Sequence, residues 1–128
     1  MADTTQIRSF KDLILWQKAF QLCMDVYRDT EGFPAEERFG LKAELRKTSR
    51  SVVYNVAEGY QRRTTKEYLR FLDIASGSRG ELETQLLLAK ALGCLSNEDS
   101  VGLLNTCEEV AKLLAGLARA LRRKSPNP

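Results

Sequence analysis

The chain has 128 residues, of which 43% are hydrophobic and 29% are charged, and these values are typical of one globular domain. It contains no histidine, which excludes Ser-His and Cys-His nucleophile pairs and most zinc and non-haem iron sites. We therefore expect no enzymatic activity, no cofactor and no metal. The net charge of +3, from 20 Lys and Arg against 17 Asp and Glu, permits an acidic partner without requiring one.

The first predicted helix covers about residues 10–30. Ser9 is a typical N-cap, and the apolar residues that follow have the three-and-four spacing of one helix face. Gly32 and Pro34 end this helix, since glycine terminates helices and proline cannot extend them backwards. A second helix should begin just after Pro34 and run to about Arg62.

The third predicted helix follows a turn at residues 62–65, with Thr64 or Thr65 as its N-cap. Its apolar residues repeat at alternating spacings of three and four over the whole length, which is a heptad pattern. We expect it to run to about Leu92, where Gly93 ends it.

A fourth helix begins at a cap formed by Ser96 or Asn97. Four amphipathic helices with short connections predict an all-α fold, an antiparallel up-and-down four-helix bundle. The bundle domain should cover residues 10–124, between a flexible N-terminus at 1–9 and a disordered tail at 125–128.

A polar stretch, YNVAEGY at residues 54–60, interrupts the apolar face of the second helix. In an antiparallel hairpin whose turn centres near residue 64, the numbers of facing residues add to about 128. The pairs predicted in this way are Glu58 with Arg70, Asn55 with Asp73 or Leu72, Ser49 with Ser78 and Arg79, and Gly59 with Leu69 and Tyr68.

These partners favour a structural role for the polar stretch, because one unsatisfied buried polar group costs about 1–3 kcal/mol. The residues of the predicted register-fixing network are Ser49, Asn55, Glu58, Gly59, Ser78 and Arg79. A ligand site is an alternative. A catalytic site would lack a second carboxylate and a nucleophile-base pair.

Some apolar and glycine residues lie off the stripes that face the bundle interior. They are Val53, Leu69, Gly77, Gly80, Leu87 and Leu88. Glycine inside a helix costs about 1 kcal/mol relative to alanine, so it is usually kept where another backbone approaches. We therefore expect a second contact surface, formed with a neighbouring subunit.

Basic residues gather in three clusters that are candidate nucleic-acid contacts. The first contains Arg46, Lys47, Arg50 and Tyr54, the second Arg62, Arg63, Lys66 and Arg70, and the third Arg119, Arg122, Arg123 and Lys124. Basic groups with an aromatic residue among them can hold a phosphate backbone. The alternative is a solvated face whose terminal cations complement the helix dipole. In a symmetric ring each cluster would repeat and concentrate positive charge.

The three cysteines, Cys23, Cys94 and Cys107, form no C-x-x-C pair and favour small buried thiols in a reducing compartment. The N-terminal residues contain no apolar run suited to a signal peptide, and no stretch approaches transmembrane length. We therefore expect a cytoplasmic protein without a membrane partner.

A recognisable pattern extends from about residue 10 to 95, with NVAEG at 55–59 and GSRGELETQL at 77–86 as its most specific parts. In these stretches the sequence resembles the small bacterial four-helix-bundle family that includes the protein encoded by intervening sequences in 23S ribosomal RNA genes. The resemblance implies a bundle that assembles into a homopentameric ring, and it brings no active-site residues. A more distant resemblance, to the accessory proteins of diversity-generating retroelements, implies a basic barrel that engages reverse transcriptase and nucleic acid.

Together these observations favour a non-enzymatic, oligomeric bundle that binds RNA or DNA nonspecifically through repeated basic patches. The alternative hypothesis is a structural adaptor that recruits a protein partner, such as a nucleic-acid enzyme. Salt-sensitive binding to naked RNA distinguishes the two, because only the first requires it.

Overall fold

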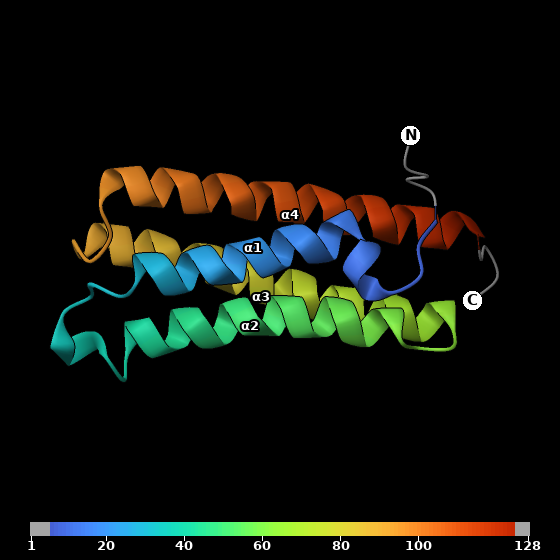
Figure 1. Ribbon diagram of the computed structural model, residues 1–128, viewed down its shortest axis with the longest axis horizontal. Coiled ribbons are helices and arrows are strands. Elements are labelled where there is room, and N and C mark those ends of the chain that lie inside the picture. The colour runs from blue at the N-terminus through green and yellow to red at the C-terminus, as the bar shows by residue number, and fades with distance from the viewer. Residues whose placement is uncertain (1–5, 125–128) are drawn as a thin grey trace.

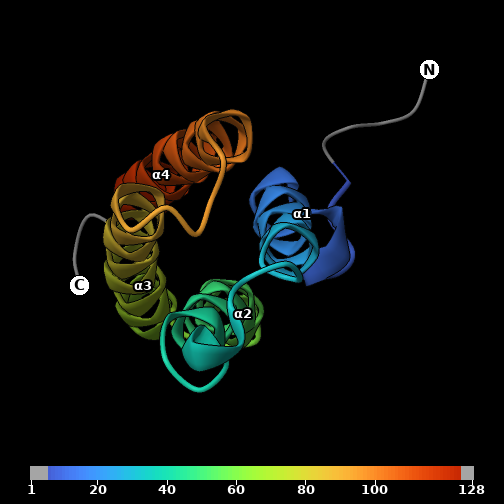
Figure 2. The same ribbon diagram turned by 90° about the vertical axis from the view of Figure 1, so that its left-hand side faces the viewer.

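The structure, a computed structural model, describes residues 6–124 and contains four long helices in this range. They are α1 (Ile14–Asp29), α2 (Leu41–Tyr60), α3 (Thr65–Ala91) and α4 (Asn97–Lys124), with short 3₁₀ helices η1 (Phe10–Asp12) and η2 (Ala35–Glu37) before α1 and α2. Successive helices are antiparallel (Figure 1). Each packs against the next, and α4 packs against α1, so the four surround one core (Figure 2). The predicted all-α four-helix bundle is confirmed.

The N-terminal end of the bundle differs from the prediction, because Ser9 caps η1 and not a long helix. Its hydroxyl accepts a hydrogen bond from the Lys11 N–H at 3.1 Å, and the Asp12 carboxylate accepts from the Ser9 N–H at 3.2 Å. Leu13 is extended, so α1 begins only at Ile14. The flexible segment predicted at 1–9 lies partly outside the described residues, as does the whole of the tail predicted at 125–128.

The second helix begins later than predicted. The residues after Pro34 form η2 and a turn, and α2 starts at Leu41. Phe33 and Leu41 are both buried, and this segment spans the distance between them. Glu37 still complements the N-terminus of α2, but from outside the helix, since its Oε1 accepts a hydrogen bond from the Leu41 N–H at 3.1 Å.

The ends of α3 and α4 follow the local signals in the sequence. The Thr64 hydroxyl accepts from the Glu67 N–H at 3.1 Å and caps α3. Gly93 has φ of +78°, the left-handed conformation that glycine adopts at helix ends. Of the two residues predicted to cap α4, Ser96 does so, because its hydroxyl accepts from the Asp99 N–H at 3.0 Å.

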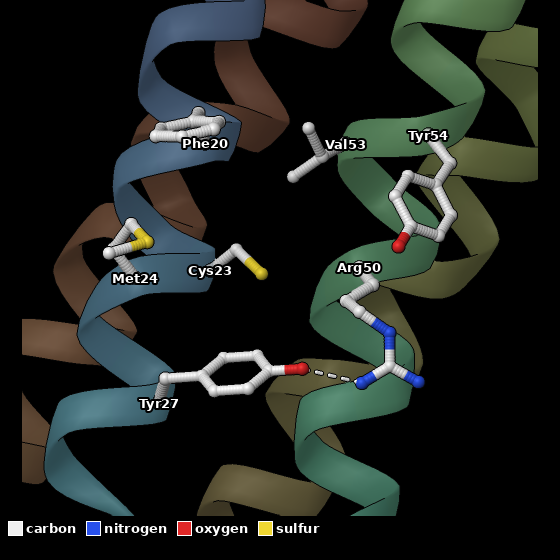
Figure 3. Close-up of a pocket in the computed structure, with 7 residues that line it drawn as sticks. All are labelled: Phe20, Cys23, Met24, Tyr27, Arg50, Val53 and Tyr54. Carbon is white, nitrogen blue, oxygen red and sulfur yellow. Dashed lines mark hydrogen bonds between the residues drawn. The ribbon is translucent and has the colours of Figure 1, made fainter.

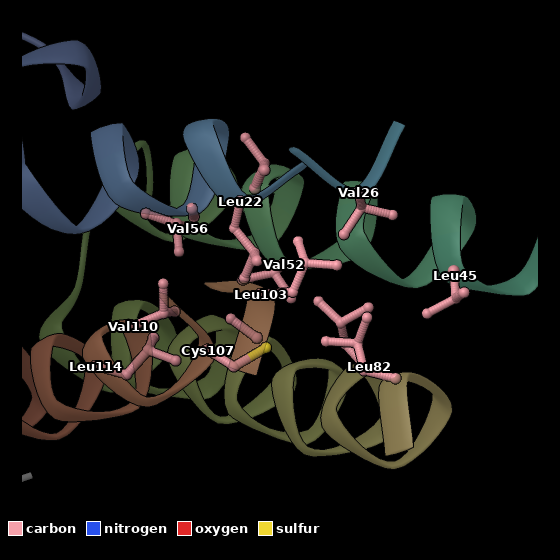
Figure 4. Packing of buried hydrophobic residues seen from close by; sticks show 14 of the residues in the cluster. Leu22, Val26, Leu45, Val52, Val56, Leu82, Leu103, Cys107, Val110 and Leu114 are labelled. Carbon is pink, nitrogen blue, oxygen red and sulfur yellow. The ribbon is translucent and has the colours of Figure 1, made fainter. Parts of the chain in front are cut away.

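All four long helices contribute aliphatic side chains to the core (Figure 4). Its fully buried members include Leu22, Val26, Leu45, Val52, Val56, Leu82, Leu86 and Val110. Burying one such side chain contributes about 1.5–3 kcal/mol. None of the described helices is long and apolar enough to cross a membrane.

The residues predicted to face a neighbouring subunit differ in exposure, and Leu69 is half-buried. Val53 was placed wrongly, because it belongs to the core with 8% of its surface exposed. Leu87 and Leu88 are about half exposed, and a Cβ built on Gly77 or Gly80 meets nothing within 4 Å. This part of the α3 surface is therefore free in the single chain.

Candidate nucleic-acid interface

A chain of hydrogen-bonded polar side chains crosses from α2 to α3. The Asn55 amide donates to the Ser51 carbonyl oxygen at 2.8 Å and to Ser51 Oγ at 3.2 Å. Ser51 Oγ in turn lies 2.8 Å from Ser78 Oγ. Ser51 was not among the residues predicted for this network, although the predicted register places it almost opposite Ser78. The half-buried amide of Asn55 is thus satisfied inside the protein.

Two of the predicted pairs within this stretch are wrong. Ser49 does not face Ser78 or Arg79 but points towards α1, where its hydroxyl lies 3.3 Å from Cys23 Sγ. It also donates to the Arg46 carbonyl oxygen at 2.9 Å. Asn55 bonds to its own helix and not to Asp73 or Leu72. Matching residue numbers across a hairpin ignores the 100° rotation per residue, which turns Ser49 and Ser51 to different sides of α2.

The charged residues of the predicted network also pair locally. Glu58 forms an ion pair with Arg62, one turn away, and Arg70 pairs with Glu67 at 3.4 Å. The predicted pair of Glu58 with Arg70 is therefore wrong. Side chains three or four residues apart are neighbours on a helix surface or at its end, so these acids have partners close by along the chain.

Arg79 connects α3 to α4 and not to α2. Its guanidinium binds Glu83 at 2.9 Å and reaches the Cys107 carbonyl oxygen at 3.5 Å. Its side chain is only 16% exposed, and these acceptors satisfy part of its donor set. The six predicted residues thus do not form one network.

Gly59 has the close helix contact that the sequence predicted with Tyr68. A Cβ at this position would lie 3.1 Å from Tyr68 Cδ1 and 3.0 Å from Phe71 Cβ. Gly59 is buried, so the missing side chain lets the two aromatic residues of α3 approach the backbone of α2.

The first basic cluster does not form one surface. Arg46 and Arg50 face α1, whereas Lys47 lies on the α3 side of α2, in a polar hollow that also contains Ser51 and Ser78. Arg50 donates a hydrogen bond to the Tyr27 hydroxyl at 2.6 Å. The three cations therefore cannot bind the same phosphates.

Arg46 is occupied by the end of α1. Its guanidinium donates to Thr30 Oγ1 and to the Tyr27 carbonyl oxygen, both at 2.9 Å, and pairs with Glu31 at 3.1 Å. The same group lies 4.6 Å from the centre of the Tyr27 ring. These contacts make Arg46 a structural residue that joins α1 to α2.

The second and third clusters meet at one end of the bundle. The α2–α3 turn and the C-terminus of α4 lie at the same end (Figure 1). The exposed cations of these two clusters that form no ion pair within residues 6–124 are Arg63, Lys66, Arg119, Arg122, Arg123 and Lys124. The sequence alone did not place these two clusters together. We call these six residues the basic end.

Arg62 and Arg70 lie beside the basic end but are engaged with neighbours. Their guanidinium carbons are 4.5 Å and 4.7 Å from the centre of the Phe71 ring, in addition to their pairs with Glu58 and Glu67. Two cations over one aromatic ring stabilise the turn between α2 and α3. Their charges are partly neutralised, so they contribute less to phosphate binding than the basic end does.

A cationic pocket that residue spacing did not predict lies at the start of α2. It has a volume of about 480 Å³, and its walls include Tyr27, Arg38, Phe39, Lys42 and Arg50. Phe39 is 89% exposed. The prediction of an unbroken helix after Pro34 gave residues 38–40 no separate role, and Gly40 was the available signal that the helix is interrupted there.

A second groove separates α1 from α2 and is mostly apolar (Figure 3). Phe20 and Met24 of α1 and Tyr54 of α2 border it, with exposed fractions of 45%, 53% and 62%. The Tyr27–Arg50 hydrogen bond closes one end (Figure 3). An apolar groove bordered by exposed apolar and aromatic side chains is typical of a surface that contacts another protein.

Burial disfavours ionisation of one thiol and one phenol. Cys107 is buried, and burial raises the pKa of its thiol to about 12. Burial likewise raises the pKa of Tyr68 to about 12. Cys23 and Cys94 are partly buried and free. Within residues 6–124, no group of three Cys, Asp or Glu side chains is placed to hold a metal ion.

Comparisons with known proteins agree with this architecture. The model of the 23S rRNA-intervening sequence protein family matches residues 11–116. A crystal structure of a protein with unknown function from the S23 ribosomal protein family of Bacteroides thetaiotaomicron VPI-5482 is similar, with a TM-score of 0.74 at 18% sequence identity. The similarity covers 82% of this chain and 98% of that chain. None of the curated proteins compared with the chain matches it.

Proposed function

The chain belongs to the 23S rRNA-intervening sequence protein family, and from the charges of its bundle we propose that it is a non-enzymatic protein that binds RNA or DNA. The binding surface is the basic end, where six exposed Lys and Arg side chains are free of ion pairs within residues 6–124. This is the observation that carries the proposal. Such cations bind phosphates without reading bases, so the binding is nonspecific and weakens as salt increases.

Self-association is the second part of the proposal. A homopentameric ring, which the family resemblance implies, would repeat the basic end around an axis and multiply a modest charge. Two surfaces support such contacts: the glycine-bearing face of α3 at Gly77 and Gly80, and the apolar groove between α1 and α2. We place this assembly in the cytoplasm.

A protein adaptor is the second candidate function, and the apolar groove favours it. Phe20, Met24 and Tyr54 expose about half or more of their surfaces along one groove, which suits an apolar helix or strand of a partner. In this case the partner would be a nucleic-acid enzyme, and naked RNA would not bind.

The test is a titration of labelled RNA and DNA by fluorescence anisotropy over a range of salt concentrations. We expect the double variant Arg122→Glu/Arg123→Glu to bind more weakly and with a shallower salt dependence than the wild type. Lys90→Glu is a control with one reversed charge, because Lys90 is exposed and lies near the C-terminal end of α3, at the opposite end of the bundle. It should leave binding almost unchanged.

Two results would overturn the proposal. The first is an absence of RNA and DNA binding at low salt. The second is a loss of binding free energy per reversed charge that is equal in Lys90→Glu and in the basic-end variant, which would mean that net charge and not the basic end determines binding. Light scattering at several concentrations tests the ring, and a strict monomer would exclude it.

A further inference from the structure

The cationic pocket at the start of α2 combines positive charge with an uncovered aromatic ring. Arg38, Lys42 and Arg50 border it and form no ion pair within residues 6–124. No carboxylate is among the described residues that line the pocket, and Glu31, the nearest ion-pair partner, binds Arg46. The pocket therefore has an excess of cations that attracts an anion.

Phe39 provides the aromatic surface of this pocket. It is 89% exposed, more than any other large hydrophobic residue in the described part of the chain. The Arg38 guanidinium lies 5.5 Å from the centre of its ring, a cation–π distance that leaves most of the ring accessible. A planar, uncharged group can therefore stack on Phe39 while an anion attached to it meets the cations.

We propose that this pocket binds single-stranded nucleic acid, with one base stacked on Phe39 and the adjacent phosphates held by Arg38, Lys42 and Arg50. The proposal rests on the proposed nucleic-acid binding and adds a site that distinguishes single strands from duplexes. In a duplex the faces of the bases are covered by their neighbours, so Phe39 has nothing to stack on. A cationic groove beside a stacking ring is the arrangement by which proteins bind single strands without sequence preference.

The size and position of the pocket agree with this ligand. Its volume of about 480 Å³ lies in the range of small-molecule sites and accommodates one nucleotide unit. Tyr27 and Arg50 line both this pocket and the neighbouring apolar groove, and the hydrogen bond between them separates the two. Arg46 forms part of the wall but keeps its bonds to Thr30 and Tyr27.

The test compares the full chain with Phe39→Ala, Phe39→Tyr and the control Leu92→Ala, which removes another exposed apolar side chain. The probes are a labelled strand of about a dozen thymidines and a duplex of the same length, at low salt. We expect Phe39→Ala to weaken single-strand binding by about 5- to 100-fold and to leave duplex binding unchanged. Phe39→Tyr should retain the affinity, since a phenol also stacks, and Leu92→Ala should behave as the wild type.

Each other result has a defined meaning. If Phe39→Ala binds the single strand normally while Arg122→Glu/Arg123→Glu has lost affinity, the pocket is excluded and the proposed function stands. An equal loss for single strand and duplex overturns stacking. A lower molar mass of Phe39→Ala than of the wild type on light scattering would show that a second copy covers Phe39. That result would also refute the site. If the wild-type protein binds neither probe, both proposals fall.

Discussion

Ser51 Oγ and Ser78 Oγ lie 2.8 Å apart across the interface of α2 and α3. The Asn55 amide, one turn further along α2, donates a hydrogen bond to Ser51 Oγ. Moving α3 by one residue along α2 shifts it by about 1.5 Å and rotates its side chains by about 100°. The contact therefore exists in only one register. We interpret this chain of polar groups as a device that aligns the two helices.

Removing either serine hydroxyl should destabilise the protein. We expect Ser51→Ala and Ser78→Ala each to lower the free energy of unfolding by about 1 kcal/mol, because each leaves the other hydroxyl with fewer partners. The double variant should lose less than the sum of the two, since the shared bond can be lost only once. Urea unfolding measures the free energy of unfolding of the two single variants and the double variant. Ser76→Ala, on the exposed face of α3, is the control. Strict additivity would mean that the two hydroxyls do not interact.

Two glycines in adjacent helices should respond in opposite directions to alanine. At Gly59 a Cβ would meet Phe71 Cβ at 3.0 Å and the Tyr68 carbonyl oxygen at 3.3 Å, so Gly59→Ala should cost about 1–3 kcal/mol. At Gly77 a Cβ meets nothing within 4 Å, so Gly77→Ala should stabilise the chain by up to about 1 kcal/mol through helix propensity. Thermal unfolding compares them, and a shift of the same sign in both would contradict the geometry.

The helices and most of their ends could be predicted from the sequence because they depend on nearby residues. Thr64 and Gly93 act within a few residues of their own positions, and the heptad pattern of α3 is a property of one segment. The delayed start of α2 could not be predicted in this way. It depends on the burial of Phe33 against other helices, which forces the extra turn before Leu41.

The candidate site was less predictable than the fold for the same reason. The predicted pair of Glu58 with Arg70 failed because Arg62, just past the end of α2, lies only four residues along the chain from Glu58. The cationic pocket was missed because Phe39 and Arg38 become accessible only when the helix is broken there. Such outcomes depend on competition between local and distant partners, which residue spacing does not resolve.

Gln85 offers a test of an unsatisfied polar group in the core. Its side chain occupies the interior stripe of α3 with 7% of its surface exposed, and its Oε1 has no hydrogen-bond partner within residues 6–124. We expect Gln85→Leu to increase the free energy of unfolding by about 1 kcal/mol, because it removes the orphaned acceptor and keeps a side chain of similar size. This corresponds to about 4 °C in Tm.

Calorimetry can check the effect of Gln85→Leu, with Gln85→Ala as the contrast. The alanine variant also removes the acceptor but leaves a cavity, so it should be less stable than Gln85→Leu. A lower Tm for Gln85→Leu than for the wild type would mean that the Gln85 amide is satisfied and contributes to the fold, for example through the polar hollow that contains Lys47 and Ser78.

Stability should fall in alkaline solution through Cys107 and Tyr68. Burial raises the pKa of the thiol from an ordinary 9.0 to about 12, and that of the phenol from 10.0 to about 12. The folded chain therefore keeps both protons at a pH where the unfolded chain releases them. This contribution is complete below pH of about 9 and decreases as the pH rises towards about 12.

We expect the free energy of unfolding to decline over this interval, and Tyr68→Phe and Cys107→Ala each to make the decline shallower. Leu103→Ala, a core truncation without a titrating group, should lower the whole curve and leave its shape unchanged; an equally steep decline in the Cys107 variant would show that its thiol does not contribute.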